Sequence, residues 1–165
     1  ALAPGASKDV IELALKARDC AIAGGDATGA GQRLAVIDYS KPSTQKRMWV
    51  FDLRDDRLLY AEHVAHGQGS GANYATAFSN REGSHQTSLG LFRTAETYMG
   101  GNGYSLRMDG LDPGFNDQAR ARAIVMHGAP YVNPTAALQT GRLGRSLGCP
   151  AVRAQVAREI IDTLK

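Results

Sequence analysis

The chain has 165 residues, of which 43% are hydrophobic and 21% are charged, values typical of a single soluble globular domain. Its 19 basic and 16 acidic residues give a formal charge of +3. Because the two kinds are interspersed, no nucleic-acid partner is expected. No apolar run approaches the roughly 18 residues that a transmembrane helix needs. The first ten residues carry neither a Met nor the basic and apolar regions of a signal peptide, and we interpret this as a leader segment that has been removed.

The N-terminal part is predicted to form one helix over residues 8–23. Apolar residues recur there at helical spacing, Ser7 is a suitable N-cap, and Gly24-Gly25 ends the pattern. Cys20 lies among apolar neighbours in this helix, so it is expected to be a buried thiol. Residues 24–32 are interpreted as a flexible connection. The segment 1–33 is therefore expected to pack on a domain formed by residues 34–165.

The rest of the chain is rich in strand patterns joined by polar turns. Strands are predicted over residues 34–40, 47–53, 57–67, 89–97, 104–111 and 123–126, the first three as an antiparallel meander. Helices are predicted over residues 115–123, 133–140 and 153–165. A Gly-rich and Ser-rich loop over residues 67–87 is too long for a simple connector, which is typical of functional loops. The expected fold class is a mostly-β (α+β) domain with peripheral helices.

One cysteine stands outside any apolar rhythm, in the sequence GRSLGCPAV of residues 144–152. Gly148 permits unusual backbone angles and close approach, and the N–H groups of Leu147, Gly148 and Cys149 are free to converge beside the sulfur as an oxyanion hole. Arg145 adds positive potential that favours a thiolate and a substrate carboxylate. Local composition leaves two interpretations open: a loop that presents a nucleophile, or a tight turn whose cysteine is incidental.

A cysteine nucleophile needs a base, and two of the four histidines have a suitable context. His127 follows the apolar run AIVM and precedes a glycine, so its ring is expected at the rim of a strand. His66 has the same context in HVAHG, and spacing alone does not choose between them. A dispersed zinc site of His66, His127 and Cys149 is a weaker alternative, because the chain has no CxxC or HExxH motif.

Several segments in one order resemble the murein L,D-transpeptidase catalytic domain family, the YkuD-like L,D-transpeptidases of bacterial cell walls. They cover most of residues 34–161: HGQGSGANYATAFSN, TSLGLFRTAETY, GYSLRMDGLDPGFND, AIVMHGA and GRLGRSLGCPAV. The resemblance implies a β-sandwich-like catalytic domain. It also implies a signature of an HG pair followed by a loop of the form [ST]-x-G-C.

The signature matches His127-Gly128 and Ser146-Leu147-Gly148-Cys149. By this resemblance Cys149 is the nucleophile, His127 is the base, and the Gly128 carbonyl orients the imidazole. His66 then becomes a residue that shapes the substrate groove beside Tyr74. Two positions depart from the family pattern: Leu147 replaces a histidine, and Ala151 replaces an arginine, whose charge we expect Arg145 to supply.

The implied activity is acyl transfer on peptidoglycan. Cys149 would form a thioester with a tetrapeptide stem and release D-alanine, and a second stem would accept the acyl group. The alternatives are an L,D-carboxypeptidase that hydrolyses the same bond and a non-catalytic cell-wall binding module. The family implies no metal or organic cofactor, a periplasmic or cell-envelope location, and acylation by carbapenems. The sequence does not determine the oligomeric state.

Overall fold

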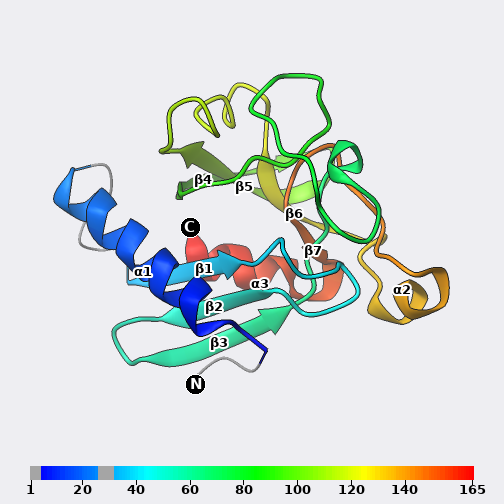
Figure 1. Ribbon diagram of the computed structural model, residues 1–165, viewed down its shortest axis with the longest axis horizontal. Helices are drawn as coiled ribbons and strands as arrows, with labels where there is room; N and C mark the ends of the chain where they lie inside the picture. Colours follow the sequence, from blue (N-terminus) through cyan, green and yellow to red (C-terminus); the bar gives the residue numbers. More distant parts are fainter. Residues whose placement is uncertain (1–4, 26–31) are drawn as a thin grey trace.

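The computed structural model describes residues 5–25 and 32–165, and within them the chain forms two β-sheets and three α-helices. Figure 1 shows the two sheets one above the other, with the C-terminal helix between them and the N-terminal helix across the outside of the lower sheet. The elements in chain order are α1 (Lys8–Ala23), β1 (Arg33–Ile37), β2 (Met48–Asp52), β3 (Arg57–Glu62), the short 3₁₀ helix η1 (Gln68–Ser70), β4 (Phe92–Gly100), β5 (Gly103–Gly110), β6 (Val125–Ala129), α2 (Pro134–Thr140), β7 (Ala151–Arg153) and α3 (Ala154–Leu164).

The first sheet is an antiparallel meander in the order β1-β2-β3. All five residues of β2 are buried, because each face of the sheet is covered by a different layer. On the outer face, Trp49 and Phe51 pack against the apolar side of α1. On the inner face, Met48 and Val50 belong to the main core.

The second sheet has the order β4-β5-β6-β7. A long hairpin joins β4 to β5, and β6 adds antiparallel to β5. The last strand, β7, pairs with β6 in parallel, with Ala151 beside His127 and Val152 beside Gly128. This single parallel pair brings residues just before β7 to the start of β6.

The main core fills the space between the two sheets. Helix α3 contributes one apolar face to it, on which Ile160 and Ile161 are fully buried. Gly128 allows this helix to approach β6, because a Cβ there would lie 2.6 Å from the Cβ of Ala157 and 3.1 Å from the Cα of Ala154. The α+β sandwich expected from the sequence is therefore confirmed, with α3 packed between the sheets.

The element predictions are confirmed at all six strands and at the helices over residues 8–23, 133–140 and 153–165, with shifts of a few residues at their ends. Two differ from the structure. Residues 115–123 form successive turns instead of a helix, and the three-residue strand β7 was missed. Cys20, expected to be buried, is exposed on α1. Most of the predicted flexible connection, residues 26–31, lies outside the described residues.

Candidate active site

The cysteine loop, residues 141–150, connects α2 to β7. It contacts the long loop over residues 67–88, here called the 67–88 loop, through the bridge between Gly67 and Ser146. Gly148 has a φ of +125°, a conformation that side chains with a Cβ rarely adopt. A Cβ at this position would also lie 2.9 Å from both the Gln86 carbonyl oxygen and the Ile124 side chain. The sequence requirement for glycine before Cys149 therefore has two physical causes, backbone angle and lack of space.

Ser146 fixes the shape of this loop from within. Its Oγ donates a hydrogen bond to the Cys149 carbonyl at 2.6 Å and accepts one from the Gly148 N–H at 3.1 Å. Its backbone is held from outside, because the Ser146 N–H donates to the His66 carbonyl and the Gln68 N–H donates to the Ser146 carbonyl. Ser146 is thus a buried connector between the cysteine loop and the segment that follows β3.

The Cys149 sulfur sits at the start of β6, with 9% of the residue exposed. Its Sγ accepts a hydrogen bond from the Val125 N–H at 3.4 Å, and its S–H donates to the Ala123 carbonyl at 3.5 Å. Burial raises the pKa of the thiol, while the Val125 N–H and the positive charge of Arg122 oppose that rise. The resting residue is therefore a thiol that needs a base before it can act as a nucleophile.

His127 lies within β6, two residues after Val125, so the strand continues past it and its ring is buried instead of standing at a rim. Its Nδ1 is 2.9 Å from the Gly128 carbonyl oxygen. A carbonyl only accepts hydrogen bonds, so Nδ1 carries the proton and Nε2 is the nitrogen able to take one. In the parallel register His127 pairs with Ala151, and Cys149 lies two residues before Ala151 in the chain.

The backbone of the cysteine loop also offers N–H donors. The Gly148 N–H is already bound to Ser146. Within the described part of the chain, the N–H groups of Leu147 and Cys149 have no hydrogen-bond acceptor. Leu147 is 57% exposed, so this position of the cysteine loop presents an apolar group, not an imidazole, to solvent.

A sequence model of the L,D-transpeptidase catalytic domain matches residues 2–165, nearly the whole chain. The chain belongs to the L,D-transpeptidase catalytic domain family. Comparison with curated proteins and with solved structures returned no match. In the segments described by the structure, no helix is long and apolar enough to cross a membrane. The family match includes α1, so the N-terminal helix is part of the matched region.

The second histidine considered as the base, His66, is part of a buried polar cluster in this L,D-transpeptidase family member. Its Nδ1 lies 2.9 Å from an Arg47 guanidinium nitrogen, and its Nε2 lies 3.1 Å from the Gly71 carbonyl oxygen. Burial and the adjacent Arg47 charge both lower the pKa of His66. With both ring nitrogens engaged, His66 has no lone pair for a metal, which argues against the zinc site of His66, His127 and Cys149. Within the described residues, no group of three or more metal-ligating side chains is placed to hold a metal ion.

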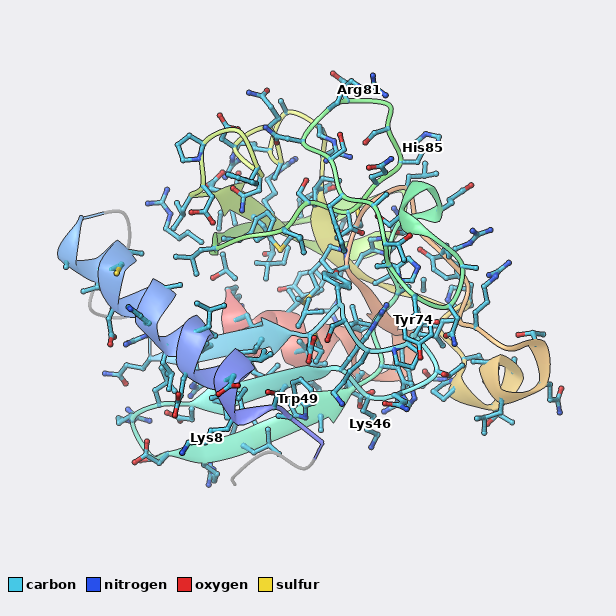
Figure 2. All side chains as sticks on the ribbon, in the orientation of Figure 1. Lys8, Lys46, Trp49, Tyr74, Arg81 and His85 are labelled. Atoms are coloured by element: carbon cyan, nitrogen blue, oxygen red, sulfur yellow. The ribbon has the colours of Figure 1, made fainter. Side chains whose placement is uncertain are left out.

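Arg145 and Tyr74 both lie close to the 68–71 segment that follows His66. Arg145 donates to the Gly71 carbonyl at 3.3 Å and to the Gln68 carbonyl at 3.5 Å. Tyr74 is 53% exposed, and Figure 2 shows it on the face of the molecule below the outer loop that carries Arg81 and His85. The roles expected for Tyr74, His66 and Arg145 at a substrate groove remain predictions.

Three residues near the sulfur were not found from the sequence: Arg122, Tyr131 and Tyr39. Burial and a charge on Cys149 raise the pKa of Tyr131 to about 12. The pKa of Tyr39 is also raised to about 12, chiefly by burial, which the Arg47 charge partly offsets and Cys149 reinforces. Arg122 supplies the positive charge that lowers the pKa of Cys149. The available signal was weak: Arg122 lies five residues before His127 in a polar segment that was predicted to be a helix.

Proposed function

We propose that this family member is a peptidoglycan L,D-transpeptidase in which Cys149 is the nucleophile and His127 is the base. The observation that supports this most directly is the Nδ1 contact of His127 with the Gly128 carbonyl. This contact fixes the tautomer that leaves Nε2 able to accept a proton. His127 lies on β6, which pairs with β7, the strand that directly follows the cysteine loop. Acyl transfer by a cysteine requires a general base that takes the thiol proton, and an imidazole with one fixed tautomer on the neighbouring strand supports this role.

In the proposed first half-reaction, His127 Nε2 takes the Cys149 S–H proton and the sulfur attacks the carbonyl of the L-centre of diaminopimelate. The C–S bond forms as the carbonyl oxygen becomes an oxyanion, which the N–H groups of Leu147 and Cys149 stabilise. A donor of this kind contributes roughly 3 kcal/mol to such a transition state. His127 then returns the proton to the leaving amine as the C–N bond breaks, so D-alanine departs and a thioester remains.

In the second half-reaction an amine of another stem attacks the thioester. His127 takes a proton from that amine, the C–S bond breaks, and the cross-linked product leaves Cys149 as a thiol again. Donor and acceptor are both peptidoglycan stems, and the enzyme works in the periplasm or elsewhere in the cell envelope. The strained β-lactam ring of a carbapenem presents an electrophilic carbonyl to the same thiol, so we expect a carbapenem to acylate Cys149.

The decisive experiment incubates the protein with purified disaccharide-tetrapeptide and follows the products by mass spectrometry. We expect cross-linked dimers and free D-alanine from the native chain and none from Cys149→Ala. Cys20→Ala is the matched control, because Cys20 is an exposed thiol on α1 and not in the cysteine loop, and it should retain full activity.

Other outcomes identify the alternatives. Tripeptides without dimers would make the protein an L,D-carboxypeptidase. Intact protein without turnover, and without a carbapenem adduct by mass, would support a binding module and contradict the proposed nucleophile. A carbapenem adduct that persists on Cys149→Ala would also contradict the proposed nucleophile.

A further inference from the structure

Arg122 connects the turn before β6 to the outer part of the 67–88 loop. One terminal nitrogen donates to the Ser79 carbonyl and to Ser88 Oγ, each at 2.8 Å. The other donates to the Gln86 carbonyl at 2.8 Å and to Ser84 Oγ at 3.2 Å. A guanidinium that binds four acceptors on one ten-residue stretch holds that stretch in a single conformation.

The same guanidinium lies against the cysteine loop. A Cβ built on Gly148 would be 3.4 Å from an Arg122 terminal nitrogen and 2.9 Å from the Gln86 carbonyl oxygen. Thr87 adds a second link between the loops, because its Oγ1 donates to the Gly148 carbonyl at 3.3 Å. Arg122 thus occupies the junction where the 79–88 stretch meets the residue before Cys149.

The ionisable side chains that interact electrostatically with Cys149 include Arg122 from the turn before β6, Tyr131 from the segment after β6, and Tyr39 from the segment after β1. His127 lies within β6, two residues after Val125. Arg122 is the permanent cation that lowers the pKa of Cys149, against the effect of burial. Glu82 on the outer loop acts in turn on Arg122.

Arg145, expected from the sequence to supply positive charge, donates to carbonyl groups of the 68–71 segment instead. Its charge lowers the pKa of His66, not that of the thiol. The position of the charge, and not its proximity in sequence, decides which residue acts on the sulfur.

We propose that Arg122 is a positioning residue of the active site, which ties the 79–88 stretch to the cysteine loop and supplies the fixed positive charge that favours the Cys149 thiolate. The proposal rests on the proposed role of Cys149 as nucleophile. In this proposal the Arg122 side chain both orders the 79–88 stretch and raises the reactivity of the Cys149 sulfur.

The test measures the rate at which iodoacetamide alkylates Cys149 as a function of pH, by intact mass. It uses a Cys20→Ala background, so that one thiol reacts. Arg122→Gln should move the midpoint of the profile upward by about one pH unit, because a nearby opposite charge lowers the pKa of an ionisable group by about one unit or more. Arg122→Lys keeps the charge and should stay within about half a unit of the parent, with a lower thermal midpoint from the lost bonds.

Arg81→Gln is the matched control. Arg81 is an exposed arginine on the same outer loop, where Figure 2 shows its side chain at the top of the molecule, away from the core. It removes one positive charge from the loop without touching the Arg122 contacts, and it should leave the alkylation profile unchanged.

The proposal is overturned if Arg122→Gln leaves the midpoint unchanged, or if the Lys and Gln variants shift it equally. Circular dichroism checks that each variant is folded. If Arg122→Gln does not fold, Arg122→Lys decides alone: a midpoint shifted by a full unit contradicts the proposal, and an unshifted one supports it. Alkylation needs no peptidoglycan, so its outcome is separate from the outcome of the transpeptidation assay.

Discussion

At the residue scale, Arg47 determines the protonation state of His66. Arg47 is completely buried and donates to the Val64 carbonyl through two nitrogens, at 3.1 and 2.6 Å, and to the Lys41 carbonyl at 3.0 Å. Arginine remains protonated in proteins and only donates, so the Nδ1 of His66 must accept. The ring proton then lies on Nε2 and is donated to the Gly71 carbonyl. The His66 ring is therefore held in its neutral form, and the His66 carbonyl accepts a hydrogen bond from the Ser146 N–H of the cysteine loop.

This geometry predicts acid sensitivity. The pKa of His66 is lowered from its ordinary value of 6.5 in the folded chain, so the unfolded chain binds the proton first, and stability is lost as pH falls below 6.5. The loss is at most about 2 kcal/mol between pH 6.5 and 5, because each pH unit counts about 1.4 kcal/mol per proton. His66→Asn places an amide oxygen where Nδ1 accepts from Arg47, and it should flatten the profile measured by urea unfolding at pH 5 and 7.

The remaining slope in His66→Asn belongs partly to His63, whose pKa is also lowered, chiefly by burial. The double variant with His63→Asn separates the two contributions. An unchanged slope in His66→Asn would show that the ring is not held neutral by Arg47.

At the element scale, the segment after β3 runs along the cysteine loop and fixes its position. Ala65 donates to the Ala151 carbonyl at 2.8 Å, and the backbone of residues 66–68 exchanges two bonds with Ser146. Gly67 lies in the middle of this contact. A Cβ there would be 2.3 Å from the His85 carbonyl oxygen and 2.8 Å from the Gly148 Cα, and backbone atoms cannot move away as a flexible side chain can.

Gly67→Ala should therefore push the cysteine loop out of place. We expect a loss of about 1–3 kcal/mol of stability, typical of overpacking, and a transpeptidation rate reduced at least tenfold. Gly101→Ala is the control, because a Cβ at Gly101 meets nothing within 4 Å. Chemical denaturation and the dimer assay measure both effects, and an active, stable Gly67→Ala protein would contradict the close contact.

Local patterns predicted the meander and the long helices, and they failed where side chains compete with the backbone. In residues 115–123 the buried Asn116 accepts from the Asp112 N–H and donates to the Leu91 carbonyl, so the segment folds as turns around this amide. Strand β7 has three residues, too few for a pattern, and it forms because β6 and Ala65 bond to it from two sides. Neither cause is visible in the spacing of apolar residues.

At the scale of the whole molecule, the candidate site combines residues that the sequence ties together with others that only the fold brings there. Cys149 and His127 were predicted because their motifs resemble a family signature. Arg122 and Tyr131 reach the sulfur through the path of the chain around β6, and no local pattern marks them. Arg145, in contrast, was expected to act on Cys149 because the two residues are close in sequence, and its charge acts on His66 instead.

The whole fold also depends on α1, which covers the outer face of the first sheet. Trp49, the single tryptophan, is fully buried there with Val36 and Phe51, and Ile11 of α1 packs against this cluster. The sheet that positions Arg47 and His66 is therefore buried on both faces only while α1 stays in place. Figure 2 shows Trp49 beside the N-terminal half of α1, near Lys8.

Ile11→Asp should lift α1 from the sheet, because it replaces packed apolar surface with a charge that burial disfavours. We expect a loss of about 2 kcal/mol or more and a red shift of Trp49 fluorescence as water reaches the indole. Leu13→Asp makes the same chemical change at a side chain that is 69% exposed, so it should stay within about 0.5 kcal/mol of the parent. Equal stability and emission in the two variants would show that α1 does not cover the sheet in solution. A destabilised Ile11→Asp chain that still alkylates Cys149 at the native rate would show that the second sheet holds the cysteine loop without help from the first.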